Sequence, residues 1–310
     1  MTSAHADRTP VTVRVPAKVN LELLVGPLRH DGFHTLSTVY QAVSLHDDVT
    51  VADDDEWGCT VTGPLAEGVP TDDDNLAVRA ARLLHDATGA GSPVHVNIRK
   101  GIPVAGGMAG GSADAAATLV ACDRLWGLGL AKDDLERYAA QLGSDIPFLI
   151  AGGTAVGSGR RESLAPVLAR GTFHWVFALA EGGLSTPTVY AECDRLRRRR
   201  IVPEPRPTPG LMGALRTGDP WELAPHLRND LQEASVSLRP ELQGVIDDGL
   251  GFGALAGIVS GSGPTVAFLV EDVEAGLDLA VALTASGVVR DVRRASGPVH
   301  GAHVIPAPVD

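Results

Sequence analysis

The residues of this chain that are best suited to chemistry lie in one glycine-rich stretch, KGIPVAGGMAGGSADAAATLVA at positions 100–121. Four glycines fall within the six positions from Gly106 to Gly111, and an alanine-rich helical pattern begins at Ser112. Glycine lets the backbone approach a phosphate closely, and the amides at a helix N-terminus carry partial positive charge. A tight strand-to-helix turn would need fewer glycines, so the stretch predicts a loop that binds nucleotide phosphates.

Neither of the two widespread phosphate-loop patterns fits this stretch. The pattern G-x-x-x-x-G-K-[ST] fails because no lysine precedes Ser112, and G-x-G-x-x-G matches no register of the four glycines. The sequence therefore favours a phosphate loop of a third type, in which a cation from outside the loop neutralises the phosphates. Lys18 and Lys100 are the candidates.

Strands and helices in alternation must position this loop. Dense β-branched residues from 11 to 51 predict two strands around a turn at 29–33. Apolar spacing and capping residues predict helices at 72–89, 112–127, 133–143, 185–196 and 240–251. Further strands are expected at 94–104 and 173–183, and the Pro-rich segment 201–209 reads as a surface connection. The pattern indicates an α+β protein with two domains that meet near residue 170.

Composition excludes several classes of protein. The 310 residues carry a formal net charge of −12, which argues against a general nucleic-acid binder. The arginines at 197–200 end a predicted helix, so a solvated helix end is the favoured interpretation. Three widely spaced cysteines, a polar N-terminus and no long apolar run predict a cytoplasmic protein with reduced thiols and no membrane partner. The acidic runs at 53–56 and 72–74 lack calcium-loop spacing, and no metal ligands are predicted.

Three ordered motifs resemble those of the GHMP kinases. They are PAKVNLELLV at 16–25, the stretch PVAGGMAGGSADAA at 103–116, and VSGSGPTVAFLV at 259–270. The resemblance implies a two-domain α+β GHMP kinase fold with the active site in the inter-domain cleft. The N-terminal domain would resemble domain 2 of a small-subunit ribosomal protein, and the C-terminal domain would be ferredoxin-like. The implied domains are 1–170, which binds ATP, and 171–310.

A finer resemblance selects one branch of these kinases. Its motifs include RHDGFHTL at 29–36, LGSDIPF at 142–148, TPTVY at 186–190 and NDL at 229–231. The branch implied is the one that uses ATP to phosphorylate the 2-hydroxyl of a cytidylated methylerythritol in non-mevalonate isoprenoid synthesis. Two alternatives stay open: a GHMP kinase of the homoserine or mevalonate type, and a catalytically silent nucleotide-binding regulator. We expect a monomer or a weak homodimer.

The resemblance also assigns roles near the reacting hydroxyl. Asp145 matches the catalytic base, and Lys18 matches the lysine that orients it and stabilises charge near the acceptor oxygen. The substrate contacts implied are Asn20, Thr186 and a base-reading pair, Phe33 and His34. Phe33 stands where tyrosine is usual, so stacking on a base is kept while a phenol contact is lost.

The implied ATP site covers the glycine stretch and two positions near the adenine. Its members are Asn75, Leu76, Lys100, Pro103, Val104, Ala105, Gly106, Gly107, Met108, Ala109, Gly110, Gly111, Ser112 and Ala113. Ala105 and Ala109 replace expected glycines, which indicates a slightly stiffer loop. The third motif, Gly261, Ser262 and Gly263, is expected to close over phosphates through its amides. Mg²⁺ is expected to arrive with ATP, held mainly by phosphate oxygens.

Overall fold

The computed structural model describes residues 8–30, 32–104, 106–159 and 163–306. It is built around a long antiparallel hairpin of β1 (Val11–Leu28) and β2 (His34–Asp53), which confirms the two strands expected around the turn. The pairing shifts register between Pro16 and Ala17 and again between Asn20 and Glu22. Such irregularities bend a strand, so β1 changes direction on both sides of Lys18.

The hairpin belongs to a sheet of eight described strands. Their order is β12-β1-β2-β4-β3, with β5 and β6 attached through β2, and β8 attached to β1. The remaining strands of this sheet are β3 (Gly58–Thr62), β4 (Val94–Arg99), β5 (Thr154–Gly159), β6 (Ser163–Pro166), β8 (Arg228–Asn229) and β12 (His303–Ile305). Both long strands are almost fully buried along their central residues, which makes the hairpin the core of the molecule.

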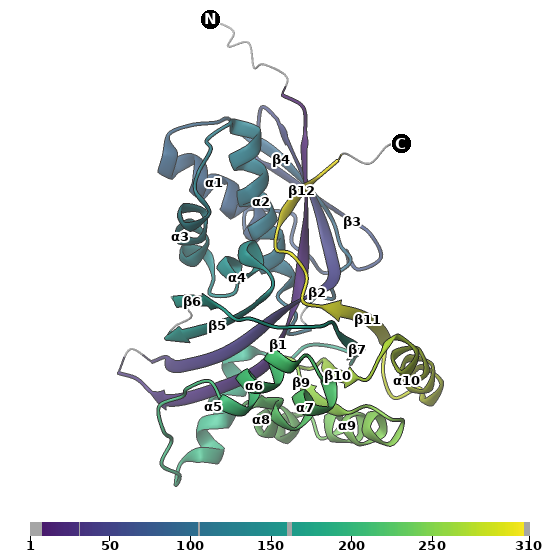
Figure 1. The fold of residues 1–310 in the computed structure, drawn as a ribbon. Coiled ribbons are helices and arrows are strands. Elements are labelled where there is room, and N and C mark those ends of the chain that lie inside the picture. Colours follow the sequence, from purple (N-terminus) through teal and green to yellow (C-terminus); the bar gives the residue numbers. More distant parts are fainter. Residues whose placement is uncertain (1–7, 31, 105, 160–162, 307–310) are drawn as a thin grey trace, which may run out of the picture.

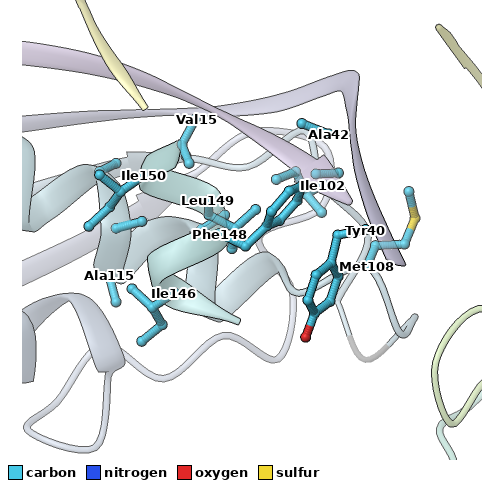
Figure 2. Packing of buried hydrophobic residues seen from close by; sticks show 14 of the residues in the cluster. Val15, Tyr40, Ala42, Ile102, Met108, Ala115, Ile146, Phe148, Leu149 and Ile150 are labelled. Atoms are coloured by element: carbon cyan, nitrogen blue, oxygen red, sulfur yellow. The ribbon is translucent and has the colours of Figure 1, made fainter. Parts of the chain in front are cut away.

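Four helices gather beside this sheet (Figure 1). They are α1 (Leu76–Thr88), α2 (Gly110–Trp126), α3 (Lys132–Leu142) and α4 (Ile146–Ala151). Helix α2 packs on β1, β2 and α1, and its small side chains at Ala113, Ala115, Ala116 and Ala117 are fully buried. Alanine allows this close approach because it adds little bulk at a helix–sheet contact. Figure 2 shows Ile146, Phe148 and Leu149 of α4 within the same apolar cluster.

A second, antiparallel sheet forms the other end of the molecule (Figure 1). Its order is β11-β7-β10-β9, made of β7 (Phe173–Leu179), β9 (Ala256–Val259), β10 (Val266–Val270) and β11 (Asp291–Gly297). The helices of this end are α5 (Thr186–Arg197), α6 (Pro209–Thr217), α7 (Pro220–Leu223), α8 (Gln232–Leu238), α9 (Glu241–Gly251) and α10 (Val273–Ser286), with a 3-10 turn at Ala224–His226. The α+β class is therefore confirmed.

The two ends are tied together by strands and a shared core. Leu23 and Val25 of β1 pack with Val189 of α5 and Leu231, and β12 returns from the chain end to pair with β1. If the chain is divided at residue 170 as proposed, the β1–β2 hairpin of the first part reaches into the second part. The last strand of the second part, β12, joins the sheet of the first part. Among the described residues, no helix has both the length and the apolar character needed to cross a membrane.

Local details differ from the sequence prediction. The strand expected at 94–104 ends at Arg99, and the one expected at 173–183 ends at Leu179. Helix α2 begins at Gly110, two residues before Ser112. Arg197 is not a solvated helix end: its guanidinium donates to the Val25 carbonyl oxygen at 2.8 Å and pairs with Asp230 at 3.1 Å. An acidic partner from a distant segment explains the difference, because the local sequence contains no sign of it.

Candidate active site

A cleft of about 430 Å³ lies where the glycine stretch meets the second part of the chain. Lys18, Leu23 and Asp145 line it from the first part, and Leu184, Tyr190 and Leu231 line it from the second. The other lining residues are Leu76, Pro103, Gly106, Gly107, Ala109, Gly110, Gly111, Ser112, Thr186, Gly261, Ser262 and Gly263. The structure therefore brings both predicted glycine motifs, the lysine and the aspartate to one place.

Lys18 reaches this cleft from the bent middle of β1. Its ammonium is almost fully buried and donates to the Gly107 carbonyl oxygen at 2.7 Å and to Asn20 Oδ1 at 2.6 Å. Asn20 Nδ2 donates in turn to Thr38 Oγ1 at 2.8 Å, which fixes the amide orientation. The geometry places one positive charge at the junction of the strand and the glycine loop.

Asp145 enters the cleft from the start of α4. It occupies the N-cap position of that helix, with Pro147 in the first turn, yet its side chain makes no capping hydrogen bond. Its Oδ1 instead accepts a hydrogen bond from the Tyr40 hydroxyl at 2.9 Å. The carboxylate is thus oriented by the neighbouring sheet, and capping does not explain its presence.

The glycine loop contacts the second part of the chain at Gly107. The Gly107 carbonyl oxygen accepts from Lys18 Nζ and from Ser260 Oγ, at 2.7 and 3.1 Å. Gly107 has a φ of 71°, and a Cβ added there would lie 2.0 Å from the Ser260 carbonyl oxygen. Ala109 has a φ of 64°, a left-handed conformation that costs an alanine about 1–2 kcal/mol.

A buried charge cluster lies beneath the loop. Lys100 Nζ donates to Asp47 Oδ2 at 2.6 Å and to Asp114 Oδ2 at 2.8 Å, and all three side chains are nearly inaccessible. Asp47 Oδ1 also accepts from the amides of Gly101 and Ile102, at 2.6 and 2.8 Å. The cluster therefore joins the start of the loop to the second turn of α2.

Charge is unevenly shared in this cluster. Burial alone would lower the pKa of Lys100, but Asp114 and Asp47 raise it overall. Burial raises the pKa of Asp114 to about 8, against the attraction of Lys100 and with the added repulsion of Asp47. Near neutral pH Asp114 is therefore the weaker counter-charge for the ammonium.

The third glycine motif forms the opposite wall. Thr186 Oγ1 and Ser262 Oγ lie 2.8 Å apart, and both residues line the cleft. Asn229 Nδ2 donates to the carbonyl oxygens of Val259 and Gly261, each at 2.7 Å. Asn229 therefore holds the turn at 259–261 in place, which gives the first residue of the NDL motif a structural role.

An aromatic pair stands at one side of the cleft. His34 begins β2, is 9% exposed, and stacks on Tyr190 with ring centroids 5.4 Å apart. Its Nε2 donates to Asp194 Oδ1 at 2.9 Å, which leaves Nδ1 as the other polar atom of the ring. Phe33, the preceding residue, is 54% exposed.

Several predicted site residues lie outside the cleft lining. Asn75 is buried as the N-cap of α1, with Oδ1 accepting from the Ala77 amide and Nδ2 donating to the Pro70 carbonyl oxygen. Val104 is exposed, while Lys100, Met108 and Ala113 are buried beneath the loop. Asn20, Phe33 and His34 are also outside the lining residues. Ala105 falls outside the described residues.

Sequence reasoning missed the residues that hold others in place: Tyr40, Asp47, Asp114, Tyr190 and Asn229. Asp114 gave a signal of such a role, because it interrupts a run of alanines on a buried helix and a buried carboxylate needs a partner. Tyr40 gave a similar signal, since a tyrosine in a buried strand needs an acceptor for its hydroxyl. Their partners lie far away in sequence, so the pairs themselves were not predictable.

The cleft contains the groups that phosphoryl transfer needs: a cation, a carboxylate and many backbone amides at a helix N-terminus. Within the described ranges, no group of three or more His, Cys, Asp or Glu residues could hold a metal ion. All three cysteines are buried and unpaired.

Comparisons with known proteins agree with this architecture. A family model of the GHMP kinases N terminal domain matches residues 75–153, and one of the GHMP kinases C terminal domain matches 211–288. A homoserine kinase from Cytophaga hutchinsonii superposes with a TM-score of 0.73 over 98% of this chain and 99% of its own, at 18% identity. That likeness shows the fold alone. The protein belongs to the GHMP kinases, and the predicted two-domain fold is confirmed.

Nearer relatives define the branch. The 4-diphosphocytidyl-2-C-methyl-D-erythritol kinase of Mycolicibacterium smegmatis is 58% identical over 301 residues, covering 96% of this chain and 93% of its own. A crystal structure of a 4-(cytidine 5'-diphospho)-2C-methyl-D-erythritol kinase gives a TM-score of 0.75 at 31% identity, covering 92% of this chain and 98% of its own. The chain belongs to the 4-diphosphocytidyl-2-C-methyl-D-erythritol kinase family, so it is a small-molecule kinase of isoprenoid synthesis that uses ATP.

Proposed function

We propose that this kinase transfers the γ-phosphoryl group of ATP to the 2-hydroxyl of 4-diphosphocytidyl-2-C-methyl-D-erythritol, giving the 2-phosphate and ADP. The relatives' names suggest the substrate. The observation that carries the proposal is the shared cleft of Lys18, Asp145 and the glycines of both motifs. This arrangement suits an alcohol that must lose a proton while it attacks a phosphate.

In this proposal Asp145 accepts the proton of the attacking hydroxyl. Lys18 offsets negative charge at the acceptor oxygen and helps to keep the carboxylate ionised, because a nearby cation favours the charged form. Its ammonium is well placed for this task, since it lies at the contact between β1 and the phosphate loop. Amides of Gly110 and Gly111, at the start of α2, bind the transferred phosphate through the positive end of the helix.

The cytidine end of the acceptor is proposed to lie at Phe33 and His34. Asp194 fixes the His34 Nε2 hydrogen, so in neutral His34 the Nδ1 atom accepts from the exocyclic amine of cytosine. The exposed Phe33 ring supplies a stacking surface. Asn20 and Thr186 are proposed to contact the methylerythritol diphosphate, Thr186 from the cleft wall beside Ser262.

ATP is proposed to lie between Leu76 and the glycine loop. Leu76 lines the cleft directly, whereas Asn75 acts by fixing the start of α1. Lys100 acts on ATP through the loop that it supports, because its ammonium is paired below it. The cleft fits Mg²⁺ held mainly by phosphate oxygens and water, since Asp145 is the single carboxylate among its described lining residues and Ser112 offers a hydroxyl. The ion would offset phosphate charge during transfer.

A coupled kinase assay tests this function. We expect ATP-dependent turnover of the cytidylated acceptor, with kcat/KM well above that for homoserine, mevalonate or an acceptor without the base. Equal kcat/KM values would contradict the cytosine site. Asp145→Asn is expected to lower kcat by about 10²–10⁴-fold with substrate binding largely kept. The exposed Asp133→Asn change on α3 is the matched control and should leave kcat unchanged.

We also propose a cytoplasmic location, which suits three buried, unpaired thiols. Sedimentation analysis of the purified protein tests the expected monomer or weak homodimer. A stable larger assembly would contradict it.

A further inference from the structure

Tyr40 is a fully buried tyrosine whose hydroxyl reaches the cleft carboxylate. It lies in the middle of β2, and its hydroxyl donates to Asp145 Oδ1 at 2.9 Å across 105 positions of sequence. In Figure 2 its oxygen points away from the labelled apolar side chains, at the edge of the cluster. The ring is therefore part of the core while the hydroxyl belongs to the site.

Packing holds this ring in one place. It stacks on Phe148 of α4, with centroids 4.8 Å apart and an angle of 21° between the planes. On β5, a Cβ added to Gly157 would lie 3.0 Å from Cε2 of the Tyr40 ring, which is tighter than an ordinary contact. With its ring held by β5 and α4, the hydroxyl has little freedom to leave Asp145.

We propose that Tyr40 is a positioning residue for phosphoryl transfer. Its hydroxyl donates to Oδ1 of Asp145, which restricts the orientation of the carboxylate and favours its ionised form. The proposal rests on the proposed function, in which Asp145 is the base. It also explains how the carboxylate is oriented although its helix makes no capping bond to it.

A purely structural role predicts different behaviour. A buried phenol needs a hydrogen-bond acceptor, and in a purely structural role Asp145 would only supply that acceptor to the Tyr40 hydroxyl. In that case Tyr40→Phe would change stability alone, because the ring and its stacking on Phe148 are kept. The pH dependence of turnover separates the two roles, since a lost donor to the base makes its ionised form less favourable.

The experiment compares Tyr40→Phe with the wild type in full kinetics between about pH 4 and 9. We expect kcat to fall about tenfold, KM for ATP to stay within about twofold, and the acid limb of the kcat profile to move about one pH unit upward. Tyr138→Phe is the matched control, because Tyr138 lies on α3 outside the described lining of the cleft. In the Asp145→Asn background, Tyr40→Phe should cause no further loss.

The outcomes separate the two proposals. If Asp145→Asn is inactive while Tyr40→Phe keeps the wild-type kcat and pH profile, the role of Tyr40 is overturned and that of Asp145 stands. If Asp145→Asn turns over normally, the base itself is wrong and both fall. Should Tyr40→Phe fail to fold, Gly157→Ala keeps the hydroxyl but displaces the ring, so the same upward shift is expected. A wild-type profile in a folded Gly157→Ala enzyme would overturn the proposal.

Discussion

The two carboxylates that share Lys100 are predicted to respond in opposite ways to amide substitution. Asp47 accepts two backbone amides in addition to the ammonium. Asp114 accepts from Lys100 through Oδ2, while its buried Oδ1 has no partner among the described residues. Burial raises the pKa of Asp114 to about 8, which predicts a largely protonated side chain at pH 7. Asparagine is a close mimic of that state.

The magnitude follows from proton linkage. Folded Asp114 keeps a proton that the unfolded chain releases above about pH 4, so wild-type stability falls as pH rises from about 4 towards 8. The slope for one group approaches about 1.4 kcal/mol per pH unit, which makes about 2 kcal/mol between pH 6 and 8. We expect Asp114→Asn to remove this difference and to stay within about 1 kcal/mol of the wild type at pH 6.

Asp47→Asn should be costly at every pH. It leaves a buried ammonium without its main counter-charge, and removing one partner of a buried pair costs about 3–5 kcal/mol. Urea unfolding at pH 6, 7 and 8, followed by circular dichroism, measures all three proteins. The reasoning is refuted if Asp114→Asn keeps the wild-type slope, or if it is as destabilising as Asp47→Asn, because Asp114 would then be ionised in the folded protein.

The other predictions concern the loops and the thiols. Gly107→Ala is expected to destabilise by more than about 2 kcal/mol, because its φ is 71° and the new Cβ would meet Ser260; a stability equal to the wild type in urea unfolding would contradict this. Ala109→Gly should stabilise by about 0.5–1 kcal/mol in the same assay, since it relieves a left-handed alanine, and a net loss would speak against that strain. Burial raises the pKa of Cys59 to about 11 and that of Cys122 further, so a thiol reagent at pH 8 should label neither until the protein is unfolded; rapid labelling of the native protein would show an accessible thiol.

Local signals predicted the elements that carry the site. The β-branched run specified the hairpin, and glycines followed by alanines specified a loop and helix α2. These features depend on nearest neighbours in the chain, so a single sequence suffices to find them. Placing Lys18 beside Asp145 required the order of family motifs, because nothing local to either residue points to the other.

The tasks of individual polar side chains were harder to predict. The sequence predicts Lys100 as a cation for ATP, but its ammonium pairs with two buried carboxylates below the loop. Asn75 caps a helix where a direct ligand contact was expected. For Lys100, carboxylates brought close by folding decide which way the long side chain points. Asn75 is engaged instead by nearby backbone groups of Ala77 and Pro70. Residue type therefore does not by itself decide whether a polar side chain faces the cleft or supports it from below.

Gly107 shows why two distant glycine motifs can serve one ligand. Its carbonyl oxygen accepts from Lys18 in β1 and from Ser260 beside the third motif, so a single peptide links both walls of the cleft. The approach is close enough that any side chain at Gly107 would collide with the Ser260 carbonyl. Moving the walls apart would break one of these hydrogen bonds and withdraw the Lys18 ammonium or the third motif from the proposed phosphate site. The geometry of this one residue therefore couples the position of the cation to the positions of the two loops proposed to bind phosphates.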